Sequence, residues 1–308
     1  MDEKYLYHVY GLTVTSNLLL PELPIIDKKV TADVEVVIES GHDNLGLVPA
    51  NDTEFEVLDG ILVFTIQNVA RYEVKDGCSI CIFPFLEATF DQIRLFLLGT
   101  AFGALLLQRG VLPIHGSAIE INGEALISVG PSGIGKSTLA AAWVKQGLRL
   151  LTDDVAAVTQ TDSVLPMVHP AYPQQKLWKD SLAMLEMEQM GLRKVIDDYE
   201  KYRVPVTDRF IDKPMPLRAV IKIEVGESDE VHFFPLNGAE KLEVLIEQTY
   251  RFFLVEDLGL TASHFLQCHS IAKQIEVYRL IRPKEGCPPE LMIEIIKNNI
   301  FQDKVVPT

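Results

Sequence analysis

The sequence feature that most constrains the fold is a glycine-rich loop between a predicted strand and a predicted helix. Gly130-Pro-Ser-Gly-Ile-Gly-Lys-Ser137 matches the pattern of a phosphate-binding P-loop. Glu124–Val129 has the composition of a strand, and Thr138–Gln146 that of a helix closed by Gly147. Glycines let backbone N–H groups turn toward phosphate oxygens, and the amino end of a helix adds partial positive charge. We therefore expect an α/β core with an anion site at this loop; a plain glycine-rich turn is the alternative.

The side chains of the loop favour a nucleoside triphosphate together with a divalent metal ion. Lys136 is placed to reach the β- and γ-phosphates, and Ser137 to bind Mg²⁺ through its hydroxyl, with Thr138 in support. We therefore expect ATP and Mg²⁺ as cofactors. The residues predicted to contact the nucleotide are Ser132, Gly133, Ile134, Gly135, Lys136, Ser137 and Thr138.

A dipeptide upstream of the loop, Asn122-Gly123, predicts a tight β-hairpin, because both central residues of such a turn need a positive φ. Ile114–Ile121 would then pair antiparallel with the strand that carries the loop. This register sets His115 opposite Gly130, at the mouth of the loop. A lone histidine is usually structural, but this position favours a functional one. An antiparallel neighbour also predicts a mixed sheet rather than the parallel sheet of GTPases and motor ATPases.

Two adjacent carboxylates, Asp153 and Asp154, follow a short predicted strand at Leu148–Leu151. If that strand runs back beside the P-loop strand, it delivers both carboxylates near the phosphates. Phosphoryl transfer needs one carboxylate to hold Mg²⁺ and another to take the proton from the attacking hydroxyl. The two aspartates could divide these roles; a solvated turn is the alternative.

His115-Gly116, the P-loop and Asp153-Asp154 resemble, with the spacing between them, the kinase core of the HPr kinase/phosphorylase family. The resemblance is close over Pro113–Val158 and loose over the rest of the second half. It implies an α/β fold in which the P-loop sits in a mixed sheet, as in phosphoenolpyruvate carboxykinase. It also implies that one aspartate is the general base toward a serine hydroxyl, with His115 supporting it or the nucleophile. We assign Asp154 as the base and Asp153 to the metal, although the sequence alone leaves their order open.

Outside this core the chain departs from HPr kinases. A Glu-Ile-Arg-Gly-Leu-Gly-type signature is not found downstream, and His169–Trp178 stands there instead. This stretch, Tyr7–Gly11 and Tyr250–Leu254 resemble the HPr kinase-like proteins of peptide biosynthesis clusters, the lasso-peptide precursor kinases in particular. The resemblance implies ATP-dependent phosphorylation of the C-terminal serine of a precursor peptide. HPr phosphorylation in carbon regulation, a non-catalytic nucleotide-binding switch and a small-molecule kinase are the alternatives.

A basic segment could supply the cation that neutralises charge on the transferred phosphoryl group. Arg193–Arg218 carries seven of the 28 Lys and Arg residues of the chain. Arg203 is the first candidate for this catalytic role and Lys201 the second. A solvated loop with surface salt bridges is the alternative.

The net charge of −15 disfavours nucleic acid and anionic membranes as general partners. The most apolar run, Leu95–Leu107, is shorter than the roughly 20 residues of a membrane span, and its Gly99 and Gly103 predict close helix packing in a soluble core. Four cysteines without a framework and an acidic start at Met1–Lys4 predict a cytoplasmic protein. The expected partner is a peptide or small protein with an acceptor serine; assembly of identical chains is left open.

The predicted elements divide the chain into a β-rich accessory domain, residues 1–85, and a P-loop kinase domain, residues 86–308. A long helix at Glu87–Arg109 is expected to begin the second domain. Farther along, a helix is expected at Lys179–Met190, and a hairpin is expected to join Leu217–Val225 to Val231–Phe234.

Overall fold

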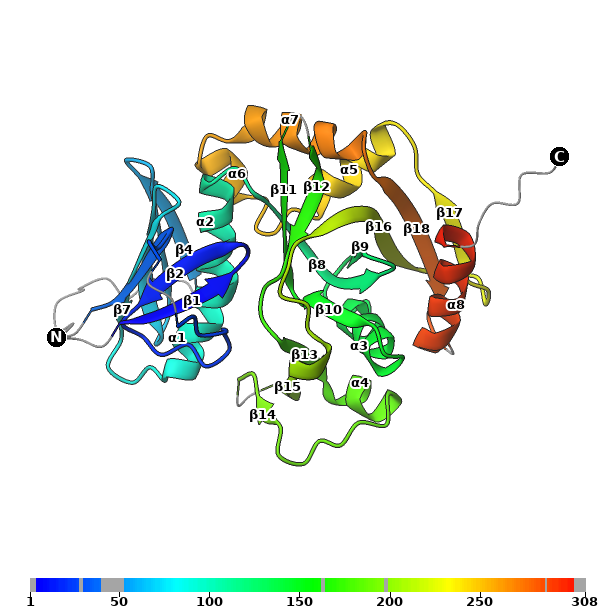
Figure 1. Ribbon diagram of the computed structural model, residues 1–308, viewed down its shortest axis with the longest axis horizontal. Coiled ribbons are helices and arrows are strands. Elements are labelled where there is room, and N and C mark those ends of the chain that lie inside the picture. The colour runs from blue at the N-terminus through cyan, green and yellow to red at the C-terminus, as the bar shows by residue number, and fades with distance from the viewer. Residues whose placement is uncertain are drawn as a thin grey trace.

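The computed structural model of the chain describes residues 4–27, 30–39, 53–161, 164–196, 199–285 and 287–301. Figure 1 shows an N-terminal sheet on the left and a larger sheet with its own helices on the right, with helix α2 (Phe102–Gln108) lying between them. Among the described residues, a third, smaller sheet lies below the larger one.

The N-terminal sheet has seven strands in the described part of the chain, in the order β1-β2-β3-β7-β6-β5-β4. Strand β5 shows why it forms: Leu62, Phe64 and Ile66 alternate with more exposed residues, which suits a sheet with one buried face. Asp59-Gly60 forms the tight turn between β4 and β5, and Asp76-Gly77 lies in the turn between β6 and β7; all four residues have a positive φ. The strands are β1 (Tyr5–Val9), β2 (Leu12–Ser16), β3 (Val34–Ile38), β4 (Thr53–Leu58), β5 (Ile61–Ile66), β6 (Ala70–Lys75) and β7 (Ser79–Pro84).

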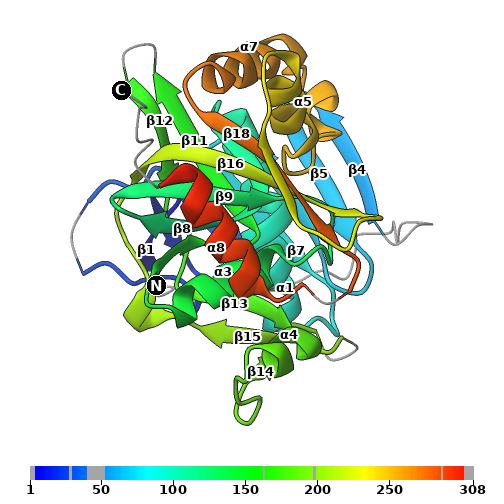
Figure 2. The same ribbon diagram turned by 90° about the vertical axis from the view of Figure 1, so that its right-hand side faces the viewer.

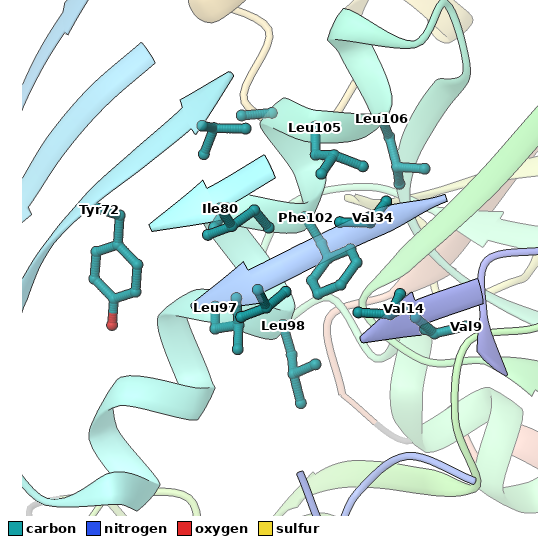
Figure 3. Close-up of a cluster of buried hydrophobic side chains, with 14 of the residues drawn as sticks. Val9, Val14, Val34, Tyr72, Ile80, Leu97, Leu98, Phe102, Leu105 and Leu106 are labelled. Carbon is teal, nitrogen blue, oxygen red and sulfur yellow. The ribbon is translucent and has the colours of Figure 1, made fainter. Parts of the chain in front are cut away.

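A helix packs across the buried face of this sheet. It runs from α1 (Phe90–Phe96) through a π-helical turn, η1 (Leu97–Ala101), into α2, and a capping box at Thr89 starts it. Figure 3 shows Phe102 and Leu105 of the helix among Val14, Val34 and other sheet residues. This is the one helix of the described residues that is long and apolar enough to cross a membrane, and 72% of its most apolar window is buried inside the protein.

The domain division proposed at residue 85 coincides with the end of the N-terminal sheet, but the helix that follows shares the core of that sheet. Its apolar side chains belong to one cluster with Val36, Phe64 and Ile80. The same cluster reaches Val155 and Tyr172 of the C-terminal half. The two halves are therefore in direct apolar contact.

The larger sheet is mixed, as the hairpin predicts. Strand β9 (Glu124–Val129) pairs antiparallel with β8 (Leu112–Ile121) on one side and parallel with β16 (Met215–Gly226) on the other. Asn122 and Gly123 have φ of 54° and 84° and form the expected two-residue turn. The other strands, among the residues described, are β10 (Arg149–Thr152), β11 (Val155–Thr161), β12 (Val164–His169), β17 (His232–Pro235) and β18 (Glu276–Pro283).

Two strand pairings differ from the sequence prediction. Strand β10 runs antiparallel to β8, not beside the P-loop strand, because β16 already occupies the second edge of β9. Strand β17 pairs with β18, not with β16, because β16 is already bonded to β9 and β18. The outer edge of β18 is the edge left for it. The predicted helix at Lys179–Met190 is also shorter, since α4 (Lys179–Met184) ends just before Glu186, whose φ is +52°.

Helices cover both faces of this sheet. Alternate residues of β9 point to opposite faces, so Leu126 packs with α3 (Lys136–Lys145) and α8 (Pro289–Ile300), whereas Ile127 packs with α5 (Ala239–Glu247) and α7 (Thr261–Ala272). Figure 2 shows α5 with α7 at the top and α8 beside α3 at the centre. The remaining described elements are α6 (Leu254–Asp257), a 3-10 turn at Thr207–Arg209, and a small sheet of β13 (Gln174–Trp178), β15 (Lys201–Pro205) and β14 (Arg193–Lys194).

The two glycines of the long helix make room for an aromatic side chain of the C-terminal half, Tyr250. A Cβ atom at Gly103 would lie 2.6 Å from Tyr250 Cδ1, and one at Gly99 would lie 3.1 Å from the Tyr250 hydroxyl. We predict that Gly103→Ala destabilises the fold by about 1–2 kcal/mol, because overpacking outweighs the gain in helix propensity. Gly99→Ala is the matched control and should cost less. Urea unfolding of both variants measures this, and equal stabilities would contradict it.

Candidate active site

The P-loop crosses from the end of β9 to the start of α3. Gly130 and Gly135 have φ of 137° and 108°, values that other residues rarely adopt. A Cβ atom at Gly130 would also lie 2.6 Å from the carbonyl oxygen of Ile223 on β16. Glycine is therefore needed here both for the turn and for close contact with the neighbouring strand. Gly135 is the N-cap residue of α3, so the amino end of this helix faces the loop.

Lys136 is held over this loop. Its side chain is buried, and Nζ donates hydrogen bonds to the carbonyl oxygens of Gly130 and Pro131, at 2.7 and 3.1 Å. Burial lowers the pKa of Lys136, and the carboxylates of Asp154 and Asp153 oppose that shift. The ammonium group thus lies where a phosphate on the loop would meet it.

A small cavity of about 100 Å³ opens at the P-loop. Six of the seven residues predicted for the nucleotide line it; Ile134 does not, and its carbonyl oxygen instead accepts a hydrogen bond from Arg282 Nε at 3.3 Å. Thr138 Oγ1 shares a hydrogen bond with Ser181 Oγ at 2.8 Å. The residues that line the cavity are His115, Ser117, Ser132, Gly133, Gly135, Lys136, Ser137, Thr138, Asp154, Lys176, Trp178, Ser181 and Lys201.

His115 lies within β8, one residue before the part of the strand that pairs with β9, and it lines the cavity at the loop. The β8–β9 ladder runs from Ile121–Glu124 to Gly116–Val129, so its register is the predicted one. One residue farther, the His115 backbone N–H donates to the carbonyl oxygen of Gln248 at 2.7 Å, and its ring stacks on Tyr250 with 5.6 Å between ring centroids. Burial lowers the pKa of His115, although Asp154 acts in the opposite sense. The imidazole is therefore neutral at pH 7.

The two aspartates occupy the connection between β10 and β11, where they have different environments. Asp153 is buried; its Oδ1 accepts from Ser117 Oγ at 2.6 Å and its Oδ2 from the backbone N–H of Lys176 at 2.8 Å. Asp154 has a φ of +89° and turns its carboxylate to the cavity, with Oδ1 3.7 Å from His115 Nδ1. Asp153 thus ties the β13 backbone to β8, and Asp154 is the carboxylate that faces the cavity.

An ion pair joins Asp154 to Lys176 of β13, with 3.0 Å between Oδ2 and Nζ. Burial by itself would raise the pKa of Asp154, but Lys176 and His115 outweigh it and lower the pKa to about 2. Burial likewise opposes the charge of Lys176, yet Tyr172 and Asp154 beside it raise its pKa. Sequence reasoning did not assign Lys176 a role. The feature that could have pointed to Lys176 is its place in the short strand Gln174–Trp178, between Gln175 and Leu177, which are both buried.

A second and larger cavity, of about 630 Å³, adjoins the first. His115, Ser132 and Asp154 line both cavities. The carboxylate of Asp154 is therefore reachable from the P-loop side and from the larger cavity. The other residues that line the larger cavity are Gly130, Pro131, Glu247, Gln248, Thr249, Tyr250, Arg251 and Phe253. This arrangement allows a phosphorylated donor and an acceptor to approach one carboxylate from two sides.

The structure does not bring Arg203 into either cavity. Its guanidinium group pairs with Glu22 Oε1 at 3.2 Å and with Asp91 Oδ2 at 3.5 Å. Arg94 also pairs with Glu22 and Asp91, which makes a buried ionic cluster between the two halves of the chain. The buried Glu22 carboxylate needs such partners, and Arg203 supplies one. Lys201, the second candidate, does line the small cavity, with Nζ 5.6 Å from the Trp178 ring centroid.

Comparison with known proteins points to the same segment. Residues 110–204 match the family model described as the HPr Serine kinase C-terminal domain. The chain is HPr kinase-like over this segment. The HPr kinase/phosphorylase of Clostridium botulinum strain Eklund 17B is 31% identical over 88 residues, which are 28% of this chain and 29% of that protein. That of Lachnoclostridium phytofermentans is 43% identical over 47 residues, 15% of each chain.

The match to these curated relatives spans less than a third of their length. Among solved structures, the Hpr(Ser) kinase/phosphatase from Coxiella burnetii aligns with a TM-score of 0.33 and 13% identity, over 60% of this chain and 88% of that one. The mixed α/β fold is established by the strand pairings themselves. The HPr kinase-like segment includes His115, the P-loop, both aspartates and Lys176.

The position of Arg203 generates a first prediction for this site. Arg203→Met should destabilise the fold by about 1–3 kcal/mol, because it removes one of the two arginines that pair with the buried Glu22 carboxylate. Arg218→Met is the matched control: its partners, Glu124 and Glu276, are exposed, so the cost should stay within about 1 kcal/mol. Chemical denaturation measures both. Unchanged stability with lost activity for Arg203→Met would restore a catalytic role for this residue.

The pKa of Asp154 generates a second prediction. A carboxyl whose pKa falls to about 2 on folding stabilises the fold above pH 4, and this contribution is lost as the pH falls through 2. Between pH 5 and pH 2 the wild type should lose about 2 kcal/mol more unfolding free energy than Asp154→Asn. Asparagine tolerates the positive φ at this position. Urea unfolding across this pH range tests it, and parallel curves for the two proteins would show that Asp154 is not held ionised.

Proposed function

We propose that this protein is an ATP- and Mg²⁺-dependent serine kinase that phosphorylates a peptide, most specifically the C-terminal serine of a lasso-peptide precursor. The observation that carries the kinase proposal is the place of Asp154. It is ionised by Lys176 and lies between the P-loop cavity and a second cavity large enough for part of a peptide. Pockets of about 300–1,000 Å³ are typical of ligand sites.

The residues present fit ATP and magnesium. The P-loop offers backbone N–H groups, a helix amino end and Lys136 to a triphosphate. Within the described residues no group of three His, Cys, Asp or Glu side chains could hold a metal ion, which suits magnesium, since it takes one or two protein oxygens and completes its shell from phosphates and water. Ser137 would supply one such oxygen. A magnesium role for Asp153 requires exchange of its hydrogen bond with Ser117 or Lys176.

Asp154 would accept the proton of the serine hydroxyl as the phosphoryl group is transferred. When bound, ATP supplies that group and magnesium balances its charge. The low pKa of Asp154 keeps it ionised at neutral pH, and the neutral imidazole of His115 beside it would help to orient the acceptor. Lys136 and Lys201 would hold the phosphates on the donor side. The reaction depends chiefly on this positioning, as phosphoryl transfer does in general.

The peptide substrate is proposed from three stretches that resemble the lasso-peptide precursor kinases. They come together in the fold, close to the larger cavity. The Tyr10 backbone N–H donates to the carbonyl oxygen of Pro170 at 2.8 Å, and a Cβ atom at Gly11 would lie 2.3 Å from the ring of His169. Tyr250, from the third stretch, lines the cavity and stacks on His115. This convergence supports a shared role for the three stretches at the acceptor side.

HPr itself is the second candidate substrate. The match of residues 110–204 to the HPr kinase family favours it. That match covers one side of the larger cavity, whereas Glu247–Arg251 and Phe253, which line its other side, lie outside the matched residues. Incubation with ATP, Mg²⁺ and either HPr or a peptide ending in serine separates the two proposals. Transfer to neither acceptor, with intact ATP binding, would favour a nucleotide-binding switch.

The proposed base can be tested by substitution. Asp154→Asn should lower kcat for phosphate transfer at least ~100-fold and leave ATP affinity largely unchanged, because the residue acts in transfer and not in nucleotide binding. Asp76→Asn is the matched control, since Asp76 also has a positive φ but lies in a turn of the N-terminal sheet. Radiolabelled phosphate transfer and nucleotide titration measure the two quantities. Full activity in Asp154→Asn would eliminate it as the base.

A further inference from the structure

The larger cavity contains one cation whose charge is not balanced by the protein. Of the three side chains there that carry full charge, Asp154 pairs with Lys176, and Glu247 pairs with Lys222 at 2.9 Å. Arg251 is the third. Within the described residues it has no carboxylate partner at salt-bridge distance. A guanidinium group without a counter-ion, in a partly buried wall of a cavity, is a ready site for an anion.

The Arg251 side chain is nevertheless held in place. Nη2 donates to Thr100 Oγ1 at 3.0 Å, and the guanidinium carbon lies 5.5 Å from the centroid of the Tyr250 ring. Nε is buried and has no hydrogen-bond partner. Thr100 belongs to the π-helical turn η1, an irregularity that is frequent at functional sites. The guanidinium group of Arg251 is already fixed in position and still has free N–H donors. Binding an anion there would therefore cost little conformational entropy.

The backbone of Arg251 is strained. Its φ is +54°, in the left-handed region where a residue other than glycine costs of order 1–3 kcal/mol. The contacts of the side chain with Thr100 and Tyr250 help to hold the residue in this conformation. Phe253, two residues on, lines the same cavity and packs edge-on against Phe55 of the N-terminal sheet. The cavity therefore combines one fixed cation with aromatic walls.

We propose that Arg251 binds the free C-terminal carboxylate of the acceptor peptide, so that the hydroxyl of its terminal serine reaches Asp154. This inference rests on the proposed serine kinase function and names the residue that selects the acceptor. The planar guanidinium matches a carboxylate in two parallel hydrogen bonds. Tyr250 and Phe253 limit the space that the larger cavity leaves for the peptide residue before the serine. A terminal serine carries its hydroxyl and carboxylate on one residue, which suits a base and a cation in one cavity.

The test uses two synthetic peptide pools, each with eight randomised positions followed by serine, one pool with a free carboxylate and the other with a C-terminal amide. Phosphate transfer from ATP is measured for the full-length wild type, Arg251→Asn and Arg251→Lys. Asparagine suits the positive φ, and lysine keeps the charge but loses the planar fork. We expect the wild type to prefer the free acid by about 10- to 100-fold in kcat/KM. Arg251→Asn should lose this preference and keep the rate on the amide, with Arg251→Lys in between.

A preference for the acid that persists in Arg251→Asn, or its absence from the wild type, would overturn the proposal. A third pool, ending in Ser-Asp-amide, distinguishes a main-chain carboxylate from an acidic side chain; better transfer to it than to the free acid also overturns it. Calorimetric binding of the same pools separates this inference from the kinase proposal. Acid-selective binding that depends on Arg251, without transfer, would refute the kinase and keep the subsite, whereas binding of neither pool would refute both.

Discussion

The ion pair between Asp154 and Lys176 is the interaction on which the site depends. It joins the end of β10 in the large sheet to β13 in the small one, and Asp153 reinforces the joint by accepting from the Lys176 backbone. The pair keeps Asp154 ionised although its surroundings are largely buried. It thereby sets the charge of the one carboxylate that lines both cavities. Without Lys176, burial would act on the carboxyl of Asp154 with less opposition and would raise its pKa.

The N-terminal half is joined to the C-terminal half by contacts that lie close to the site. Tyr250, which stacks on His115, rests against Gly103 of the long helix, and Thr100 of the same helix binds Arg251. Below the site, Glu22 pairs with Arg203, which lies directly across the strand pair from Lys176. The N-terminal sheet and the long helix therefore pack behind side chains that line the larger cavity and beside the strand pair that carries Lys176.

Local sequence patterns were reliable wherever one short segment decides its own geometry. The Asn122-Gly123 turn, the P-loop and the register that places His115 near Gly130 all follow from positive-φ requirements and strand alternation. The pairing of β10 with β8 and of β17 with β18 did not follow, because strand neighbours depend on which edges distant strands have already occupied. Helix α4 ended early for a local reason, the left-handed backbone at Glu186, which no glycine signalled.

The sequence by itself determined one side of the site: a loop with the P-loop pattern, its lysine, and two carboxylates within a few residues of a strand end. The tertiary structure decided which charges meet. Arg203 and Lys201 are two residues apart on one strand, yet one is buried in an ionic cluster with Glu22 and the other lines the cavity. Lys176 and Arg251 gained their places at the site in the same way. The partner of a charged side chain depends on long-range packing. Burying a charge costs desolvation free energy, and only an opposite charge that the fold brings close can offset that cost.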